Sequence, residues 1–166
     1  EQNHGPWYYE MQALGYNYRM TDIQAALGIS QLKKLGDFLE RRKEIVYLYN
    51  KAFGERKDLT IPYQSPASDS AWHLYVLKLK TKMLGVNRKV IFEALHRENI
   101  GVNVHYIPVH TLPYYQQLGY SIGLCPTAEK HYEEIISLPL YPGMSNADVD
   151  DVIKAVNKVI DFFNKS

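Results

Sequence analysis

The sequence is poor in cysteine, with one residue, Cys125, among 166. A lone thiol cannot form an internal disulfide, and chains without disulfides are typical of the reducing cytosol, so we expect a cytoplasmic protein. Cys125 stands between Leu124 and Pro126. We interpret it as a buried or incidental thiol rather than a nucleophile.

Long apolar runs and an excess of one charge are also lacking. No stretch approaches the roughly eighteen apolar residues of a membrane span, and no signal peptide opens the sequence. The 19 basic and 18 acidic residues give a net charge of +1, which offers no general attraction for nucleic acid or an anionic membrane. Gly-x-x-x-x-Gly-Lys and Gly-x-Gly-x-x-Gly are absent, so nucleotide hydrolysis and dinucleotide binding lack support.

The first twenty residues hold glycines, a proline and aromatic residues without a clear period, so we expect irregular structure that docks on another surface. Trp7, Tyr8 and Tyr9 are the aromatic side chains most in need of such a surface. The sequence begins without an initiator methionine and without the start of a regular element. We therefore expect a piece of a longer protein, and we expect it to self-associate when isolated.

A long amphipathic helix is predicted over residues 21–53. Thr21 as N-cap puts Gln24 at the third helical position, which is the capping-box arrangement. Apolar residues then recur at intervals of three and four, at Ile23, Ala26, Leu27, Leu32, Leu35, Leu39, Ile45, Val46, Tyr49 and Phe53. Gly28 and Gly36 each cost about 1 kcal/mol relative to alanine, so we expect a bend or a close approach at one of them. Such a helix overhangs a small domain, so we interpret it as a bridge between two parts of a larger molecule or as part of a subunit interface.

The remaining chain predicts a small sheet packed with helices. The expected elements are a short strand near 59–63, strands at 72–79, 102–105 and 136–140, a helix after Asn87, a short helix from Thr127 to about 135, and a last helix from Ser145 or Asn146. Two or three helices on one face of a small sheet give an α/β protein with an α+β small domain.

The loop before the long helix gathers Tyr16, Asn17, Tyr18 and Arg19 next to a helix N-terminus. Free N–H groups and the helix dipole favour anions there, and amide and guanidinium groups are good phosphate donors. The residues alone therefore support two interpretations, a phosphate site or a solvated loop with a surface arginine.

A second candidate cluster is His105, Tyr106 and His110, at a strand end and in the loop after it. These groups suit a polar ligand such as a sugar or its phosphates. A zinc site is a weaker alternative, since no carboxylate or cysteine lies close in sequence to complete the ligands. Histidines satisfied within a strand-to-loop junction are the interpretation that the residues alone favour. We interpret His73, in a strand beside Trp72, as structural.

A family resemblance adds to these patterns. It starts at residues 15–35, GYNYRMTDIQAALGISQLKKL, which resemble the signature that opens the second half of the DegT/DnrJ/EryC1/StrS family of pyridoxal-phosphate-dependent sugar aminotransferases. It continues through AWHLY at 71–75, VHYIPVH at 104–110, SLPLYP at 137–142 and the closing helix. Within the family, the likeness is to members of pseudaminic acid synthesis, which aminate a UDP-linked 4-keto-6-deoxy-N-acetyl sugar.

The resemblance implies the C-terminal domain of a fold-type I pyridoxal-phosphate (PLP)-dependent transferase. Residues 1–20 would be an interface and active-site loop segment of the large domain, 21–53 the long bridging helix and 54–166 the small domain. Family members are homodimers with shared active sites, in which a lysine upstream of the Asn-Tyr-Arg loop holds the cofactor. Glutamate gives nitrogen to the cofactor, and the nucleotide-linked ketosugar accepts it. That lysine's context is found nowhere here, so the isolated chain is expected to be inactive.

The resemblance also assigns roles by position. Asn17 matches the residue that reaches across the dimer to the cofactor phosphate of the partner subunit, and Tyr16 and Arg19 stand beside it as candidates for substrate binding. His105, Tyr106 and His110 match the family's loop near the sugar nucleotide. A non-catalytic structural or binding domain of the same fold stays open as the alternative.

Overall fold

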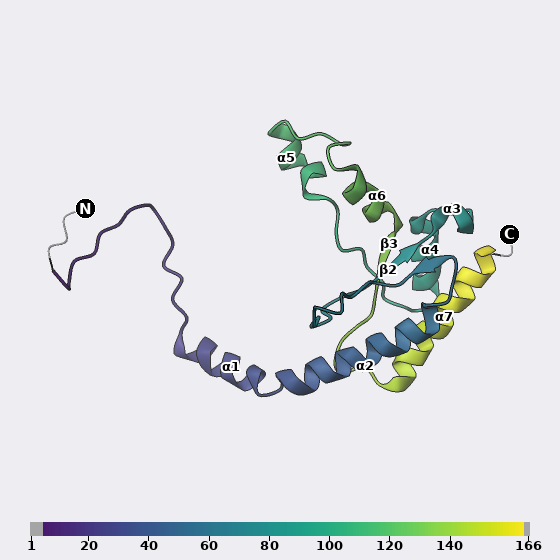
Figure 1. Ribbon diagram of the computed structural model, residues 1–166, viewed down its shortest axis with the longest axis horizontal. Coiled ribbons are helices and arrows are strands. Elements are labelled where there is room, and N and C mark those ends of the chain that lie inside the picture. The colour runs from purple at the N-terminus through teal and green to yellow at the C-terminus, as the bar shows by residue number, and fades with distance from the viewer. Residues whose placement is uncertain (1–4, 165–166) are drawn as a thin grey trace. The chain divides into compact units, whose positions relative to one another are not determined.

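The structure is a computed structural model that describes residues 5–164 (Figure 1). The chain divides into two compact units, and the division falls after Leu35. Among its described residues, the first unit has one helix, α1 (Asp22–Leu32). The second contains α2 (Leu35–Phe53), β1 (Leu59–Thr60), β2 (Tyr75–Leu79), α3 (Thr81–Leu84), α4 (Arg88–Arg97), the 3-10 turn η1 (Val109–Thr111), α5 (Pro113–Gln117), α6 (Pro126–Glu134), β3 (Ile135–Leu138) and α7 (Asn146–Asn164).

Helix α1 begins as its sequence predicts. The Thr21 hydroxyl accepts a hydrogen bond from the Gln24 backbone N–H at 3.3 Å, and the Gln24 side chain accepts one from the Thr21 N–H at 2.9 Å. Together these bonds form the expected capping box, which satisfies two of the N–H groups that a helix start leaves open.

The helix expected over 21–53 is interrupted. Lys33 and Lys34 form a turn in which the Lys34 N–H donates to the Gln31 carbonyl at 3.0 Å, so the break falls between the two glycines and at neither of them. Gly28 and Gly36 have no close neighbour among the described residues. Most helical stability in proteins comes from packing of an apolar face, and α1 has no buried residue. Packing among the described residues therefore does not enforce one continuous helix.

The sheet of the second unit is antiparallel, in the order β1-β2-β3. In β2, Tyr75, Leu77 and Leu79 are buried and alternate with less buried residues, as the period of two predicts. All of β3 is buried. The strand expected at 102–105 is reduced to one bridge, between Asn103 and Ser137.

One hydrophobic core joins the helices of the second unit to the sheet. It takes Ile45, Val46, Tyr49 and Phe53 from α2, Ile91 and Leu95 from α4, and Val149, Val152, Val156 and Ile160 from α7. Helix α4 packs on both α7 and β3, and α6 packs on β2. The core therefore positions β3 and the helix that leads into it.

Two caps confirm the predicted helix starts in this unit. The Asn87 side chain accepts the Val90 N–H at 3.2 Å and begins α4. Ser145 and Asp148 bond reciprocally before α7, at 2.7 and 3.2 Å. The start of α6 differs from the prediction, because Cys125 rather than Thr127 is its N-cap and Pro126 takes the first helical position. Cys125 is exposed rather than buried.

Candidate functional site

The predicted loop residues Tyr16, Asn17 and Arg19 lie in the first unit, and all three are exposed. The Arg19 N–H donates to the Asn17 carbonyl at 3.0 Å, and the Tyr16 and Tyr18 rings lie 5.6 Å apart between centroids. Within residues 5–164 the Asn17 amide and the Arg19 guanidinium form no hydrogen bond or ion pair. Their donors are available to a ligand.

This loop fits an anion in its chemistry. It runs directly into the capped start of α1, and no acidic side chain lies between Glu10 and Asp22. A neutral amide and a guanidinium fork at such a place are donors for phosphate oxygens. These donors suit an anionic ligand.

The second predicted cluster lies in the other unit and begins at His105. Its Nδ1 lies 3.0 Å from the hydroxyl oxygen of Ser137, a buried residue of β3. Tyr106 follows through a cis peptide bond. This residue is 69% exposed, and its hydroxyl has no partner among the described residues. The core thus orients His105 and leaves Tyr106 open to a ligand.

His110 is held by a residue that the sequence did not single out, Glu129 of α6. The ring Nε2 lies 2.7 Å from the Glu129 Oε1, and the two side chains are 10% and 20% exposed. The hydrogen bond from His110, followed by the backbone N–H groups of Gly123 and Cys125, holds the pKa of the Glu129 carboxyl below its usual value. Glu129 is therefore a carboxylate at neutral pH.

The structure anchors His105 and His110 to one continuous segment, which is formed by α6 and β3. His105 bonds to β3 and His110 to α6, and α6 runs directly into β3. Asn17, Tyr16 and Arg19 belong to the first unit, so the predicted site residues form two groups. Glu129 was missed because it lies 19 residues from His110, and no local spacing rule joins them.

No set of metal ligands is assembled around these histidines. Among residues 5–164, no group of three or more histidine, cysteine, aspartate or glutamate side chains is arranged to hold a metal ion. His110 has one carboxylate neighbour, Glu129, and His105 has a hydroxyl neighbour, Ser137.

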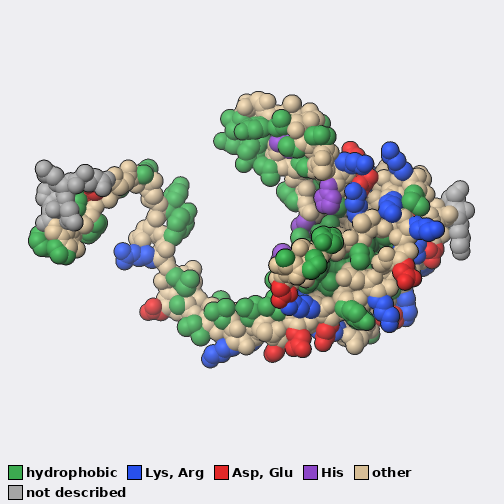
Figure 2. Space-filling model, viewed as in Figure 1, with side chains coloured by type: hydrophobic (Ala, Val, Ile, Leu, Met, Phe, Trp, Pro, Cys, Tyr) green, Lys and Arg blue, Asp and Glu red, His purple; other side chains and the backbone are tan. Residues whose placement is uncertain are grey.

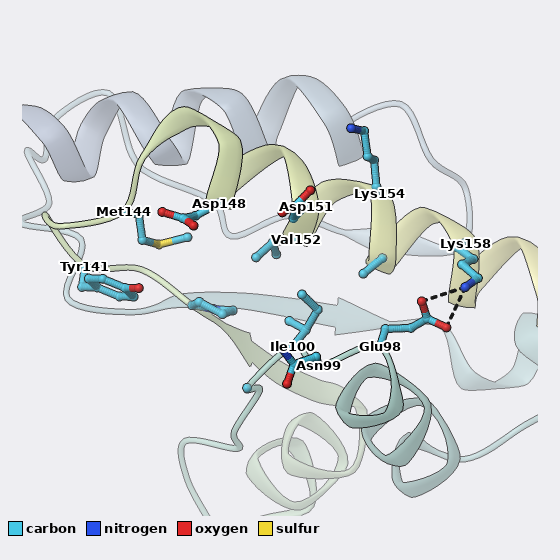
Figure 3. A pocket seen from close by; sticks show the side chains of 13 residues that line it. Glu98, Asn99, Ile100, Tyr141, Met144, Asp148, Asp151, Val152, Lys154 and Lys158 are labelled. Carbon is cyan, nitrogen blue, oxygen red and sulfur yellow. Dashed lines mark hydrogen bonds and ion pairs between the residues drawn. The ribbon is translucent and has the colours of Figure 1, made fainter.

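A separate hollow of about 620 Å³ lies between the end of α4 and α7 (Figure 3). Two of its charged side chains pair with each other, since the Glu98 carboxylate accepts two hydrogen bonds from Lys158, at 2.8 and 2.7 Å. Asp148 caps α7 through Ser145. None of the predicted site residues lines it. The hollow is therefore no part of the candidate site.

Hydrophobic side chains gather over the segment that carries α5 (Figure 2). Exposed there are Tyr114, Leu118, Tyr120, Ile122 and Leu124. Among the described helices, none is long and apolar enough to cross a membrane.

Comparison with known proteins gives a consistent result. Residues 2–157 match the DegT/DnrJ/EryC1/StrS aminotransferase family. The chain is 48% identical over 160 residues to the spore coat polysaccharide biosynthesis protein SpsC of Bacillus subtilis, covering 95% of this chain and 41% of SpsC.

Solved structures agree with the sequence match. Helicobacter pylori PseC, an aminotransferase involved in the biosynthesis of pseudoaminic acid, superposes with a TM-score of 0.82 at 30% identity, over 97% of this chain and 43% of PseC. The protein Spr1654 of Streptococcus pneumoniae, solved in a PLP form and a PMP form, gives a TM-score of 0.82 at 30% identity for the PLP form, over 95% of this chain and 40% of that protein.

The chain spans about two fifths of the length of these relatives. The small α/β fold matches the C-terminal portion of PLP-dependent aminotransferases, so the predicted fold class is confirmed. Since the family match runs through nearly the whole sequence and includes both candidate groups, the chain belongs to the DegT/DnrJ/EryC1/StrS aminotransferase family.

Proposed function

We propose that this chain is the C-terminal part of a PLP-dependent aminotransferase that moves an amino group from glutamate to the 4-keto carbon of a nucleotide-linked 6-deoxy sugar. Family membership supports the reaction class. The PLP and PMP forms of the Streptococcus protein support the cofactor. The role of PseC in pseudoaminic acid biosynthesis and that of SpsC in polysaccharide biosynthesis support a sugar as acceptor.

The observation that carries the proposal is the pair of unengaged donors in the loop before α1. Asn17 would hold the cofactor phosphate through its side-chain amide, and Tyr16 and Arg19 would contact the substrate beside it. When bound, PLP supplies the electron sink through which an amino group changes partners. No lysine precedes Lys33 in the sequence, so the lysine that attaches the cofactor would come from a region outside this chain.

His105, Tyr106 and His110 would contact the sugar nucleotide. Imidazole N–H groups and a phenolic O–H are donors that match diphosphate and sugar oxygens. Their position at a loop held by β3 and α6 keeps these donors on a rigid support, which lowers the entropy cost of binding.

The proposal also includes a homodimer in the cytoplasm. Trp7, Tyr9, Ile23 and Leu27 are exposed apolar side chains of the first unit, and such surface favours association with another subunit. The low cysteine content supports a reducing compartment.

The test is cofactor binding with the full-length enzyme assembled from this chain and a PLP-binding upstream domain. Asn17→Ala removes one hydrogen bond to a charged group, so we expect PLP to dissociate about tenfold more readily, as followed by absorbance. Gln31→Ala, at an exposed residue of α1, is the matched control and should retain PLP like the parent.

Amino transfer from glutamate to a nucleotide-linked 4-ketosugar should require both this chain and the upstream domain. Equal PLP retention by the Asn17 and Gln31 variants would refute the role of Asn17. If the assembled protein neither binds PLP nor transfers an amino group, the chain is a structural or binding domain of the same fold.

A further inference from the structure

Residues 106–125 form a long excursion from the core of the second unit. The excursion leaves at His105, which is tied to β3, carries α5 away from the sheet, and returns through α6, which leads back into β3 (Figure 1). Its own hydrogen bonds are mostly local, such as those from Thr111 to Pro108 and from Gln116 to Thr111. The excursion therefore depends on its attachment points for a fixed arrangement.

Glu129 is the attachment point that joins both limbs of this excursion. On the outgoing limb, its Oε1 lies 2.7 Å from His110 Nε2. On the returning limb, the carboxylate accepts the Gly123 N–H at 2.8 and 3.0 Å and the Cys125 N–H at 3.3 Å. Among the described residues, every side-chain hydrogen bond that leaves the excursion ends on Glu129.

The local backbone favours this cross-link. Gly123 has a φ of +91°, a backbone conformation that residues other than glycine rarely adopt. With the chain turned in this way, its N–H meets the Glu129 carboxylate. Both the carboxylate and the His110 ring are largely shielded from water, which strengthens hydrogen bonds between charged or polar partners.

The same bond defines the state of His110. Because the Glu129 carboxylate carries no hydrogen, His110 Nε2 must be the donor. The other ring nitrogen, Nδ1, has no partner among the described residues and is left for a ligand. A histidine whose one nitrogen is fixed by a carboxylate has a set tautomer and a set ring orientation.

We propose that Glu129 is a positioning residue for the sugar-nucleotide site. It orients His110 and closes the 106–125 excursion, so that the His105–Tyr106–His110 loop is ordered before the ligand arrives. The inference rests on the proposed function above. In this proposal Glu129 does not contact the substrate, and it acts through His110 and the loop.

The test uses the full-length enzyme and UDP-N-acetylglucosamine as a probe, a nucleotide sugar without the keto group that reacts. Glu129→Ala should weaken probe binding in calorimetry by about tenfold, the value of one hydrogen bond to a charged group. Glu129→Gln keeps an oxygen that can accept from His110 and Gly123, so it should recover most of the affinity. Glu133→Ala is the matched control, since Glu133 lies on the same helix, exposed and without a partner among the described residues.

Kinetics separate positioning from a general loss of structure. Glu129→Ala should raise KM for the ketosugar about tenfold while leaving the half-reaction with glutamate within about twofold of the parent. Hydrogen exchange should speed up at Gly123 and Cys125 and stay unchanged in α7.

Equal probe affinity of Glu129→Ala and the parent would overturn this inference and leave the proposed function standing. An equal loss in both half-reactions would likewise overturn it, because it would indicate a general structural role. If the parent itself binds no nucleotide sugar, the proposed function fails and this inference fails with it.

Discussion

Replacing Asp58, a buried acidic residue, by alanine should markedly destabilise the second unit. Asp58 is only 3% exposed. Its carboxylate accepts hydrogen bonds from Arg56 Nε at 2.9 Å and Nη2 at 2.8 Å, and from the Asn164 side chain. Arg56 also pairs with Asp161 of α7 at 2.8 Å. The cluster therefore ties the segment after α2 to the last turns of α7.

The magnitude follows from burial. Removing one partner of a fully buried ion pair costs about 3–5 kcal/mol. Arg56 stays partly exposed and keeps Asp161 as a partner, so we expect about 2–3 kcal/mol for Asp58→Ala. A domain of this kind has a free energy of unfolding of about 5–15 kcal/mol, so the loss is a large fraction of the total.

Urea unfolding followed by circular dichroism measures this loss. With a slope of about 2 kcal/mol per molar urea, the midpoint should fall by about 1–1.5 M. Asp161→Ala is the matched control, because it removes a carboxylate from the same arginine, but one whose side chain is 54% exposed. It should cost about 0–1 kcal/mol. Equal midpoints for the two variants would refute the argument from burial.

The stability that the Asp58–Arg56 pair contributes depends on pH. Burial disfavours the charged form of Asp58, but the hydrogen bonds and charge of Arg56 outweigh it and hold the pKa of the carboxyl below its usual value. A folded pKa below the unfolded one adds stability above the unfolded value, about 4, and loses it as the pH falls through the folded pKa. The difference in stability between the parent and Asp58→Ala should therefore shrink below about pH 4.

Two further outcomes test the fold and the first unit. Tyr49→Phe removes the hydroxyl that donates to the Pro139 carbonyl at 2.8 Å and should lower the free energy of unfolding in urea by about 1–2 kcal/mol. Tyr47→Phe, at an exposed tyrosine of the same helix, is the control and should have no measurable effect. Equal losses in the two variants would contradict the assigned bond. The isolated chain should exceed its monomer mass in light scattering, and the double variant Ile23→Glu with Leu27→Glu should reduce that mass; a monomeric parent would contradict the expected self-association.

Local sequence signals predicted most of the fold. Asn87 and the Ser145–Asp148 pair mark helix starts because a cap depends on residues within one turn. The interruption at Lys33 depends instead on whether an apolar face is packed, which periodicity alone does not reveal. In the same way, residues 102–105 alternate as a strand should, but the structure gives only the Asn103–Ser137 bridge.

The residues of the candidate site also differ in whether a local sequence pattern reveals them. Asn17 and His110 were predicted as site residues from residue type and from the family resemblance, because each stands in a recognisable stretch. Glu129 was not found, because its bond to His110 depends on the path of an excursion that no spacing rule describes. Sequence patterns thus identified groups suited to contact a ligand, and the structure added the group that holds one of them in place.

The two groups of site residues differ in how much ordering a ligand must supply. His105 and His110 are already bonded to β3 and α6, so part of their conformational entropy is lost on folding rather than on binding. Asn17 and Arg19 have no side-chain partner among the described residues, so their ordering must come from a ligand or another surface. Because fixing a rotamer-rich side chain costs about 0.5–1.5 kcal/mol at binding, a ligand of the loop before α1 meets an ordering cost that a ligand of the His105–Tyr106–His110 loop meets only in part.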